Sequence, residues 1–286
     1  MRRDDQVVAV LGAGIMASTI ADTLRGNEFR LRRYNRTPSR IHGPAVVCAT
    51  AAGAAIGAAT VWSLVHDDDA SRAVWFGPAG AMAGADGAVV IESSTLSPDY
   101  AREWSDAASA AGALPVVAPV TGSRAAAADG SLVTFAAGTD TAMTAAAPVL
   151  QAVCGEIVRI GGGPAAAALT KLLNNGMAAV ILTGLAEALA AADGAGLDVE
   201  QLTEVWSRRG WAAPAVSRYG AAMRARDHTL TDCSCAVIAK DLRYLLAALA
   251  DRVPAATAAA ADRFARTVAA GHAQAEMSAV IEVSTP

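Results

Sequence analysis

Short apolar runs alternate with longer helical patterns along the first half of the chain. The run at residues 7–11 (VVAVL) is continuously apolar and ends in a glycine turn, which is typical of a buried parallel strand. Residues 17–25 then have the pattern of a helix. Further strands are predicted at residues 29–34, 61–65, 88–92, 114–117 and 132–137. Because strands alternate with helices, we expect an α/β domain with a mainly parallel, doubly wound sheet that is covered on both faces.

The pattern changes after the three glycines at 161–163, and no later stretch reads as a strand. Residues 165–192 predict one long helix that is apolar on most faces, which indicates burial, and Gly194 or Gly196 would end it. Further helices are predicted at residues 199–207, 213–224, 236–251 and 254–270. We therefore expect two domains, an α/β domain at 1–163 and an all-α domain at 164–286.

Composition narrows the class of protein. Of the 286 residues 53% are hydrophobic and 17% are charged, which suits a well-buried globular protein, and the net charge of −4 argues against a nucleic-acid surface. The chain opens on charged residues without the pattern of a signal peptide, and the apolar stretch at 49–65 is too short and too glycine-rich to span a membrane. The four cysteines lack zinc-site spacing, so no metal is expected. We expect a soluble, cytoplasmic protein.

A glycine motif joins the first predicted strand to the first predicted helix. The segment is Gly12-Ala13-Gly14-Ile15-Met16-Ala17. Gly12 would permit a tight turn, Gly14 would let the backbone approach a pyrophosphate, and the small Ala17 would allow close packing of helix and strand. The helix N-terminus would then bind the anion, although a purely structural glycine turn is the alternative. This arrangement predicts a dinucleotide-binding Rossmann domain.

The end of the second predicted strand discriminates between NAD and NADP. An acid is expected there if NAD is used, because it binds the ribose 2′-hydroxyl, whereas this chain has Asn35-Arg36-Thr37. Arg36 can pair with a 2′-phosphate, with Asn35 and Thr37 donating hydrogen bonds and Arg33 or Arg40 as helpers. We therefore predict NADP(H) as the cofactor, against the alternative of a solvated basic loop.

Three polar side chains interrupt the long apolar helix. Lys171, Asn174 and Asn175 stand at positions i, i+3 and i+4 and therefore share one helix face. Burying them without a partner or a role would be costly. A lysine near a substrate oxygen can donate a proton as hydride arrives, which makes Lys171 a candidate general acid/base. The alternative is an exposed helix face with a solvated lysine.

Four separated motifs occur in an order that resembles the β-hydroxyacid dehydrogenase family, which includes 3-hydroxyisobutyrate dehydrogenases and glyoxylate/succinic semialdehyde reductases. The motifs are GAGIMAS at 12–18, APVTGS at 118–123, Lys171 with Asn174-Asn175, and Lys240-Asp241-Leu242. The resemblance covers essentially the whole chain. It implies a homodimer whose helical domains pack across subunits, with the active site in the cleft between the domains.

The resemblance also implies roles for individual residues. Lys171 resembles the catalytic acid/base, and Asn175 the amide that orients the substrate. Thr121, Gly122, Ser123 and Asn174 are expected to bind substrate, with Thr121 and Gly122 at its carboxylate. Lys240 resembles the lysine that closes over substrate and cofactor, although by itself it would read as a surface residue. Positions that line the cofactor groove are matched by Leu64, Val65 and Thr95.

The chain departs from the family pattern at three places. Ala17 replaces a third glycine, Val117 replaces an acid that precedes the APV run, and Leu64-Val65-His66 replaces Met-Leu-Pro. The residues around Gly122-Ser123-Arg124 favour the glyoxylate/succinic semialdehyde branch. Two alternatives remain. Imine reductases share the fold but carry Asp or Tyr in place of Lys171, and a catalytically silent NADP-binding protein would lack that lysine.

Overall fold

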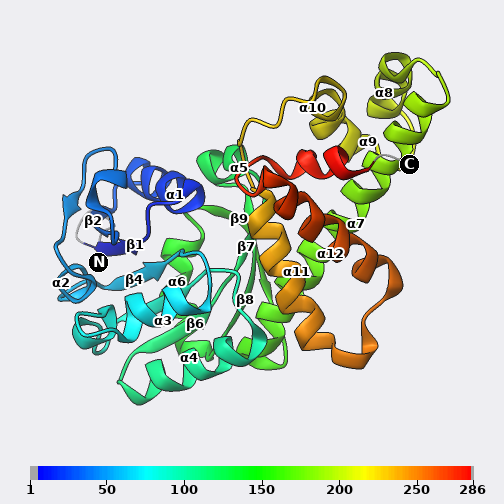
Figure 1. Cartoon of the computed structure of the whole chain (residues 1–286). Helices are drawn as coiled ribbons and strands as arrows, with labels where there is room; N and C mark the ends of the chain where they lie inside the picture. The colour runs from blue at the N-terminus through cyan, green and yellow to red at the C-terminus, as the bar shows by residue number, and fades with distance from the viewer. Residues whose placement is uncertain (1–5, 285–286) are drawn as a thin grey trace. The chain divides into compact units, whose positions relative to one another are not determined.

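The computed structural model describes residues 6–284 (Figure 1). The chain divides into two compact units between Lys171 and Leu172, inside one long helix. Each unit is described by itself. Most of the charged opening segment, in which we expected no signal peptide, lies outside the described residues.

The first unit is built on a sheet whose strand order is β3-β2-β1-β4-β5-β6-β8-β7, with β9 beside β8. Neighbours from β3 to β6 are parallel, β8 is antiparallel to β6 and β7, and β9 is parallel to β8. The strands are β1 (Val7–Leu11), β2 (Arg30–Tyr34), β3 (Val46–Val47), β4 (Thr60–Ser63), β5 (Val89–Glu92), β6 (Leu114–Val117), β7 (Val120–Thr121), β8 (Leu132–Gly138) and β9 (Cys154–Arg159). This topology confirms the predicted mainly parallel Rossmann-type sheet.

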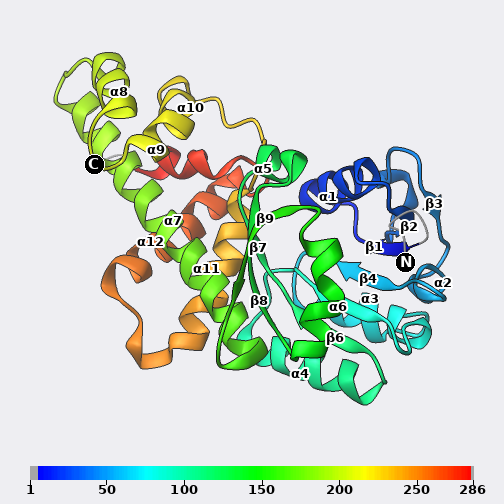
Figure 2. The same ribbon diagram turned by 180° about the vertical axis from the view of Figure 1, so that it is seen from behind.

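Helices cover both faces of this sheet because side chains alternate along each strand. Val8 and Val10 of β1 belong to the apolar core formed with α1, α5 and α6, whereas Ala9 and Leu11 belong to the core formed with α2, α3 and α4. Figure 1 shows α3 and α4 in front of the sheet, and Figure 2 shows α6 on the opposite side. The helices are α1 (Ile15–Gly26), α2 (Ala51–Ala55), α3 (Asp68–Phe76), α4 (Pro98–Ala110), α5 (Arg124–Asp129), α6 (Asp140–Leu150) and the start of α7 (Gly163–Gly194), with 3-10 turns η2 (Pro38–Arg40) and η3 (Ala81–Gly84).

The prediction missed three strands and misplaced several boundaries, of which the end of β4 and the start of α1 have a clear physical reason. β3 and β7 have two residues each, and β9 contains the exposed Gly155 and Glu156, so none shows an apolar alternation. β4 ends at Ser63 instead of Val65, because the backbone N–H of Val65 donates to the Ser94 hydroxyl (2.8 Å). α1 begins at Ile15, two residues before the predicted start, because Gly14 already serves as its N-cap.

The second unit is helical, as predicted. Among its described residues the β pairing is a single bridge between Ser234 and Glu276. The helices pack around a core that includes Leu182, Leu189, Leu242 and Phe264. They are the rest of α7, α8 (Val199–Arg208), α9 (Ala213–Ala215), η4 (Val216–Gly220), α10 (Ala221–Ala225), α11 (Cys235–Leu249), η5 (Ala250–Arg252), α12 (Ala255–Thr267), η6 (Val268–His272) and η7 (Met277–Val283).

One predicted helix of this unit is broken. The stretch predicted as a helix at 213–224 holds the π-helical turn η4 between α9 and α10. Gly220 in this turn packs against α8, where an added Cβ would lie 2.7 Å from the Thr203 Cγ2 atom. The π-helical turn therefore coincides with a close approach of two helices. The apolar pattern of the sequence does not predict this contact.

A buried carboxylate fixes the loop that leads into α11. Glu276 is 3% exposed and accepts hydrogen bonds from the backbone N–H groups of Thr231 and Asp232, each at 2.8 Å. His228 in the same segment contacts Ser278 (2.9 Å) and Glu282 (2.8 Å), both in η7. The C-terminal turn thus anchors the start of α11, the helix that carries Lys240 and Asp241.

Helix α7 is long and apolar enough to cross a membrane by length and composition alone. However, half of its most apolar stretch is buried within the structure, as in the core helix of a soluble protein. The helix also bears Lys171, Asn174 and Asn175. These features favour a core helix over a membrane span.

Candidate cofactor and catalytic residues

The turn after β1 has a backbone that only glycine can adopt. Gly12 has φ +118°, and an added Cβ would lie 2.2 Å from the carbonyl oxygen of Leu64. The Gly12 N–H donates to the Tyr34 carbonyl at the end of β2 (2.8 Å). The loop therefore packs closely against the ends of β4 and β2, as expected for a tight turn at Gly12.

The space beyond this turn suits a phosphate group. Gly14 is exposed, and an added Cβ there would meet nothing within 4 Å. It precedes α1, whose N-terminus has no side-chain cap and no acid in its first turn. Ala17 is buried with its Cβ 3.5 Å from the position of a Cβ on Gly12, so a larger residue would collide with the turn. The loop therefore fits the pyrophosphate of a dinucleotide.

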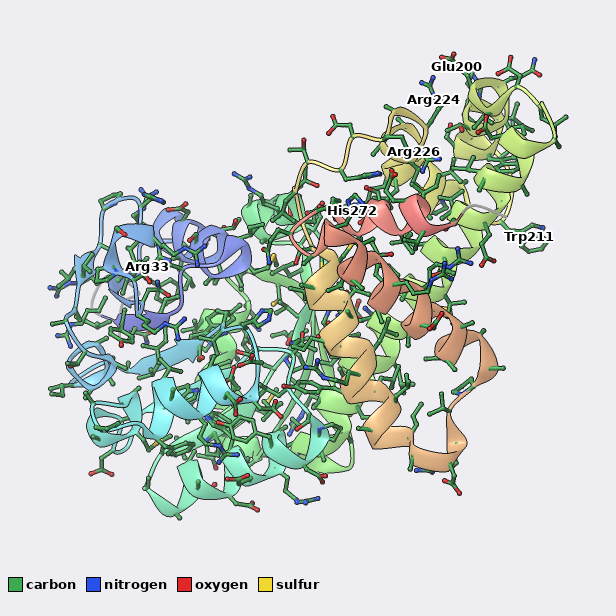
Figure 3. The ribbon with its side chains drawn as sticks, viewed as in Figure 1. Arg33, Glu200, Trp211, Arg224, Arg226 and His272 are labelled. Carbon is green, nitrogen blue, oxygen red and sulfur yellow. The ribbon has the colours of Figure 1, made fainter. Side chains whose placement is uncertain are left out.

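Arg33 does not have the place that we expected for it. The prediction made it a helper at the 2′-phosphate, but it is only 2% exposed and lies beneath the glycine loop (Figure 3). Its Nη2 atom donates to the Gly12 carbonyl (3.2 Å) and to the Ser18 hydroxyl (3.3 Å). Arginines occupy both faces of the strand sequence RLRRY, so the sequence does not indicate which of them is buried.

The residues after β2 are exposed and basic. Arg36 is exposed and forms no ion pair with any described residue, and Arg40 is exposed as well. The Asn35 side chain donates to the Thr37 carbonyl (2.8 Å) and shapes the turn between them. No carboxylate stands at the end of β2, where a site for NAD commonly has one.

The carboxyl ends of β4 and β5 carry the predicted groove residues side by side. Leu64 and Val65 follow β4, and Thr95 lies in the turn after β5. The Ser94 hydroxyl accepts from the Val65 N–H (2.8 Å), and Ser93 accepts from the Trp62 indole (2.8 Å) while donating to the Ala118 carbonyl (2.6 Å). Ligands of open α/β sheets bind at this edge.

A buried glutamate organises the turn after β5. Glu92 is fully buried, and its carboxylate accepts from the Ser71 hydroxyl (2.6 Å), the Trp75 indole (2.8 Å) and the Ser94 backbone N–H (2.8 Å). Burial raises the pKa of Glu92, and these hydrogen bonds oppose that rise. Glu92 therefore holds Ser94, and through it Val65, in place.

The predicted carboxylate-binding residues form a turn between β7 and α5. Thr121 ends β7, and Gly122 has φ +134° with no room for a side chain, because an added Cβ would lie 2.7 Å from Leu132 Cδ2. The Ser123 hydroxyl accepts from the Ala126 N–H (3.1 Å) and caps α5. The turn is thus rigid, with Thr121 and Ser123 half-buried.

The predicted catalytic residues lie on α7. Lys171 is buried at 9% exposure, whereas Asn174 and Asn175 are half-buried. Their i, i+3 and i+4 spacing places them on one face of this helix, as predicted. The Asn174 amide donates to the Asn175 side-chain oxygen (3.2 Å).

Within the second unit, Asp241 joins Asn175 to Lys240. Its Oδ2 accepts from the Asn175 amide at 2.6 Å, and its Oδ1 lies 3.0 Å from Lys240 Nζ. Lys240 is 5% exposed and lies 5.3 Å above the Tyr244 ring. The close approach of α7 and α11 makes this possible, because a Cβ on Gly176 would lie 2.6 Å from Leu245 Cδ2.

The structural roles of three buried polar residues were not predicted from the sequence. Arg33, Glu92 and Asp241 are all at most 2% exposed. The position of Asp241 directly after Lys240 was the one feature of the sequence that could have indicated its role. Nothing local distinguishes Glu92 or Arg33, since their partners lie in other segments.

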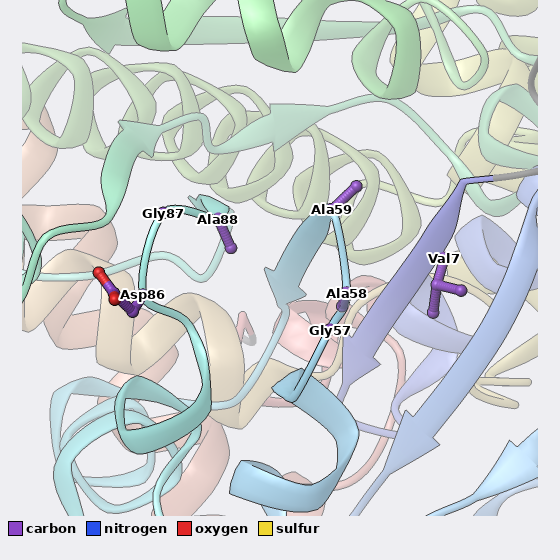
Figure 4. Close-up of a pocket in the computed structure, with 7 residues that line it drawn as sticks. All are labelled: Val7, Gly57, Ala58, Ala59, Asp86, Gly87 and Ala88. Atoms are coloured by element: carbon purple, nitrogen blue, oxygen red, sulfur yellow. The ribbon is translucent and has the colours of Figure 1, made fainter. Parts of the chain in front are cut away.

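The structure also has a hollow that is unrelated to these residues (Figure 4). It is lined by Val7, Gly57, Ala58, Ala59, Asp86, Gly87 and Ala88. These residues precede or begin β1, β4 and β5, so the hollow lies at the amino ends of the strands. The glycine loop and Thr95 lie at the opposite, carboxyl ends, where a cofactor is expected.

Comparison with known proteins agrees with this arrangement. The family described as the NAD binding domain of 6-phosphogluconate dehydrogenase matches residues 7–162, and the family described as NAD-binding of NADP-dependent 3-hydroxyisobutyrate dehydrogenase matches residues 165–284. The L-threonate dehydrogenase of Cupriavidus necator is 30% identical over 203 residues, which cover 69% of this chain and 68% of that protein.

Solved structures extend the similarity to nearly the whole chain. A 3-hydroxyisobutyrate dehydrogenase from Salmonella typhimurium has a TM-score of 0.87 at 26% identity, covering 98% of this chain and 100% of that one. The Mycobacterium tuberculosis 3-hydroxyisobutyrate dehydrogenase, solved with L-serine, has a TM-score of 0.81 at 28% identity, covering 97% and 98%. A Streptomyces aurantiacus imine reductase shares the fold at 23% identity and a TM-score of 0.65, covering 98% and 100%. The chain therefore belongs to the β-hydroxyacid dehydrogenase family, whose members are NAD(P)-dependent oxidoreductases.

Proposed function

We propose that this protein is an NADP(H)-dependent oxidoreductase that interconverts a small hydroxy acid and its aldehyde or keto acid. The observation that carries the proposal is the buried Lys171 on the same helix face as the amides of Asn174 and Asn175. Proton transfer to and from a substrate oxygen is the role that the chemistry of the family requires, and a lysine on this helix face can fill it.

In this reaction a bound nicotinamide would supply or accept the hydride. Lys171 would donate its proton to the carbonyl oxygen during reduction and take it back during oxidation. Its positive charge would also stabilise the alkoxide as it develops. The amide of Asn175 would hold the reacting oxygen, because Asp241 already orients that amide through a 2.6 Å hydrogen bond.

The substrate carboxylate would be bound at Thr121 and Gly122, and Ser123 and Asn174 would also contact the substrate. The turn is rigid, so its donors need no reordering when an anion arrives. Lys240 would close over substrate and cofactor, with its ammonium oriented by Asp241. We propose residues 1–163 as the cofactor domain and residues 164–286 as the domain for substrate and dimer contacts.

For the cofactor we propose NADP(H) over NAD(H). Arg36 is exposed and without an ion-pair partner among the described residues, and Asn35 and Thr37 flank it. A 2′-phosphate would give this guanidinium a partner. Gly12, Ala13, Gly14, Ile15 and Met16 would bind the pyrophosphate, and Leu64, Val65 and Thr95 would line the rest of the cofactor groove.

The substrate class follows from the relatives and from the substrate turn. A similar protein is named L-threonate dehydrogenase and others are named 3-hydroxyisobutyrate dehydrogenase, so small hydroxy acids are the substrates of the relatives. Gly122-Ser123-Arg124 favours glyoxylate or succinic semialdehyde as the oxidised partner. We further propose that the protein is soluble and cytoplasmic and acts as a homodimer.

Imine reduction on the same fold is the second candidate, favoured by the similarity to imine reductase structures. Lys171 argues for carbonyl chemistry instead. The experiment is NADPH depletion by wild type and Lys171→Ala with glyoxylate, succinic semialdehyde and a cyclic imine. We expect turnover of an aldehyde acid and a loss of about a hundredfold in kcat for the variant, the scale of general acid catalysis.

Other outcomes of this experiment would point elsewhere. Turnover of the cyclic imine alone would reject the proposal in favour of imine reduction. Binding of NADPH without any turnover would identify a silent cofactor-binding protein. An unchanged kcat in Lys171→Ala would remove the acid/base role while leaving the substrate class standing.

A further inference from the structure

Arg33 places a buried positive charge directly under the glycine loop. It stands in β2 opposite Val10 of β1 and is 2% exposed. Its Nη2 atom donates to the Gly12 carbonyl (3.2 Å) and the Ser18 hydroxyl (3.3 Å), and its Nη1 atom donates to the His42 carbonyl (3.4 Å). One guanidinium thus joins the turn, the first turns of α1 and the segment that follows Arg36.

The backbone N–H and the carbonyl of Gly12 both form hydrogen bonds with residues of β2. The Gly12 N–H donates to the Tyr34 carbonyl at 2.8 Å, and the Gly12 carbonyl accepts from Arg33. Gly12 has the left-handed φ of +118°, which the surrounding contacts must maintain. Arg33 is therefore one of the groups that determine the shape of the anion-binding turn.

The charge of Arg33 has no counter-ion within ion-pair distance among residues 6–284. The acid that acts on it is Asp22 of α1, which is exposed and lies 3.3 Å from Arg25. The Nε atom of Arg33 is buried without a hydrogen-bond partner. Burial lowers the pKa of this guanidinium and Asp22 opposes the change, but an arginine keeps its proton at any physiological pH.

A buried cation without a paired anion destabilises a protein unless a ligand supplies the missing charge. The turn that Arg33 supports is the one whose open side, at Gly14, fits a phosphate group. We propose that Arg33 is a positioning residue for the dinucleotide pyrophosphate: it fixes the Gly12 turn and contributes a buried positive charge that the bound anion neutralises.

This inference rests on the proposed cofactor site but assigns Arg33 a task different from that of Arg36. Arg36 is exposed and would contact the 2′-phosphate, which only NADP(H) has. The pyrophosphate is common to NADP(H) and NAD(H). Loss of Arg33 should therefore weaken both dinucleotides by the same factor, whereas loss of Arg36 should weaken NADPH much more than NADH.

The experiment measures the Kd of NADPH and NADH, by fluorescence titration, for wild type, Arg33→Met, Arg33→Gln, Arg33→Lys and Arg36→Ala. We expect Arg33→Met and Arg33→Gln to weaken both dinucleotides by about tenfold or more, the scale of a lost charge-assisted interaction. Arg33→Lys keeps the charge and should lose less than Arg33→Gln. Arg36→Ala is the matched control, with a larger loss for NADPH than for NADH.

Thermal unfolding gives a second readout that needs no turnover. Replacing an unpaired buried charge by a well-packed apolar side chain can stabilise a protein, so Arg33→Met without cofactor should have a Tm equal to or above that of wild type. The rise in Tm on adding NADPH should then be smaller in Arg33→Met. If Arg33→Met does not fold, Arg33→Gln, which retains a donor for Gly12, carries the same comparison.

Three results would overturn the inference. Wild-type affinity for both dinucleotides in Arg33→Gln would remove Arg33 from cofactor binding. A loss confined to NADPH would make it a 2′-phosphate residue. Equal losses in Arg33→Lys and Arg33→Gln would show that its charge is irrelevant. Failure of wild type itself to bind either dinucleotide would instead reject the proposed function.

Discussion

The carboxylate of Asp241 accepts a 2.6 Å hydrogen bond from the amide of Asn175, a residue 66 positions earlier in the chain. The other oxygen of the same carboxylate lies 3.0 Å from Lys240 Nζ. Asp241 is 1% exposed, so its carboxylate is shielded from solvent. Two proposed substrate residues from different helices therefore depend on one buried acid.

Asp241→Asn should lower kcat/KM by a larger factor than it weakens the binding of NADPH. Asn keeps an acceptor for Asn175 but leaves Lys240 without its counter-charge, and a misplacement of about 1 Å at a reacting group costs about a hundredfold. Steady-state kinetics together with NADPH titration separates the two effects. Asp262→Asn, an exposed acid on α12, is the control and should behave as wild type. Wild-type kinetics in Asp241→Asn would reject the positioning role.

The glycine loop allows a prediction that separates folding from binding. Gly12→Ala should lose at least about 2 kcal/mol of unfolding free energy, because its φ of +118° disfavours a side chain and its Cβ would meet the Leu64 carbonyl at 2.2 Å. Gly14→Ala has φ −74° and open space, so it should unfold as wild type.

If the pyrophosphate binds at this turn, Gly14→Ala should nevertheless raise the Kd of NADPH by about tenfold or more, since its methyl group enters the space where the backbone approaches the phosphate. Gly26→Ala, at the other end of α1 and also without neighbours within 4 Å, is the matched control. Equal affinity in Gly14→Ala and Gly26→Ala would place the cofactor elsewhere.

The sequence predicts the architecture well because the parallel strands and the long helices carry clear apolar periodicity. The runs at β1 and β6 are apolar throughout, β5 is apolar up to Glu92, and α7 was expected at nearly its observed length. β9 was missed because CGEIVR has exposed residues at its second and third positions. Its strand geometry comes from pairing with β8, which is a long-range property.

The site could be predicted from the sequence only where a local motif identifies the chemical role of its residues. The turn at Gly12 and the helix face of Lys171 could be read locally, since spacing alone fixes them. Asp241 and Arg33 could not, because their importance depends on partners in distant segments and on burial. An arginine in β2 would be expected to face solvent. The hydrogen bonds that Arg33 donates to Gly12 and Ser18 show instead that it points into the protein.

The Glu92 network should give the stability a pH dependence. Burial raises the pKa of Glu92 above that of an unfolded glutamate, so the protonated form is favoured by folding. The stability due to this group is thus fully present below the unfolded pKa and is lost as the pH rises through the folded pKa.

Glu92→Gln cannot ionise, so its deficit in unfolding free energy relative to wild type should shrink as the pH rises from about 4 upward. Urea unfolding at several pH values measures this difference. Glu92→Ala should be less stable than wild type by about 2 kcal/mol or more, because the Ser71, Trp75 and Ser94 donors lose their acceptor. Glu156→Gln, an exposed acid on β9, is the control. A deficit that grows with pH would contradict the predicted direction.

An exposed apolar stripe on α7 is where we expect two copies of the chain to associate. Leu173, Met177 and Ile181 recur every four residues and are 47%, 63% and 43% exposed. Trp211 in the same unit is fully exposed as well (Figure 3). Large apolar side chains grouped in this way are typical of subunit interfaces.

Met177→Lys would bury an unpaired charge in such an interface and should shift the protein from dimer to monomer, as measured by light scattering after size exclusion over a range of concentrations. Its far-UV circular dichroism should remain that of wild type, because the position is solvent-exposed within the single chain. Phe76→Lys places the same charge on α3, where Phe76 is 37% exposed, and should leave the mass unchanged. A Met177→Lys protein that keeps the dimer mass at every concentration would exclude this face from the interface, and a wild-type monomer would reject the homodimer itself.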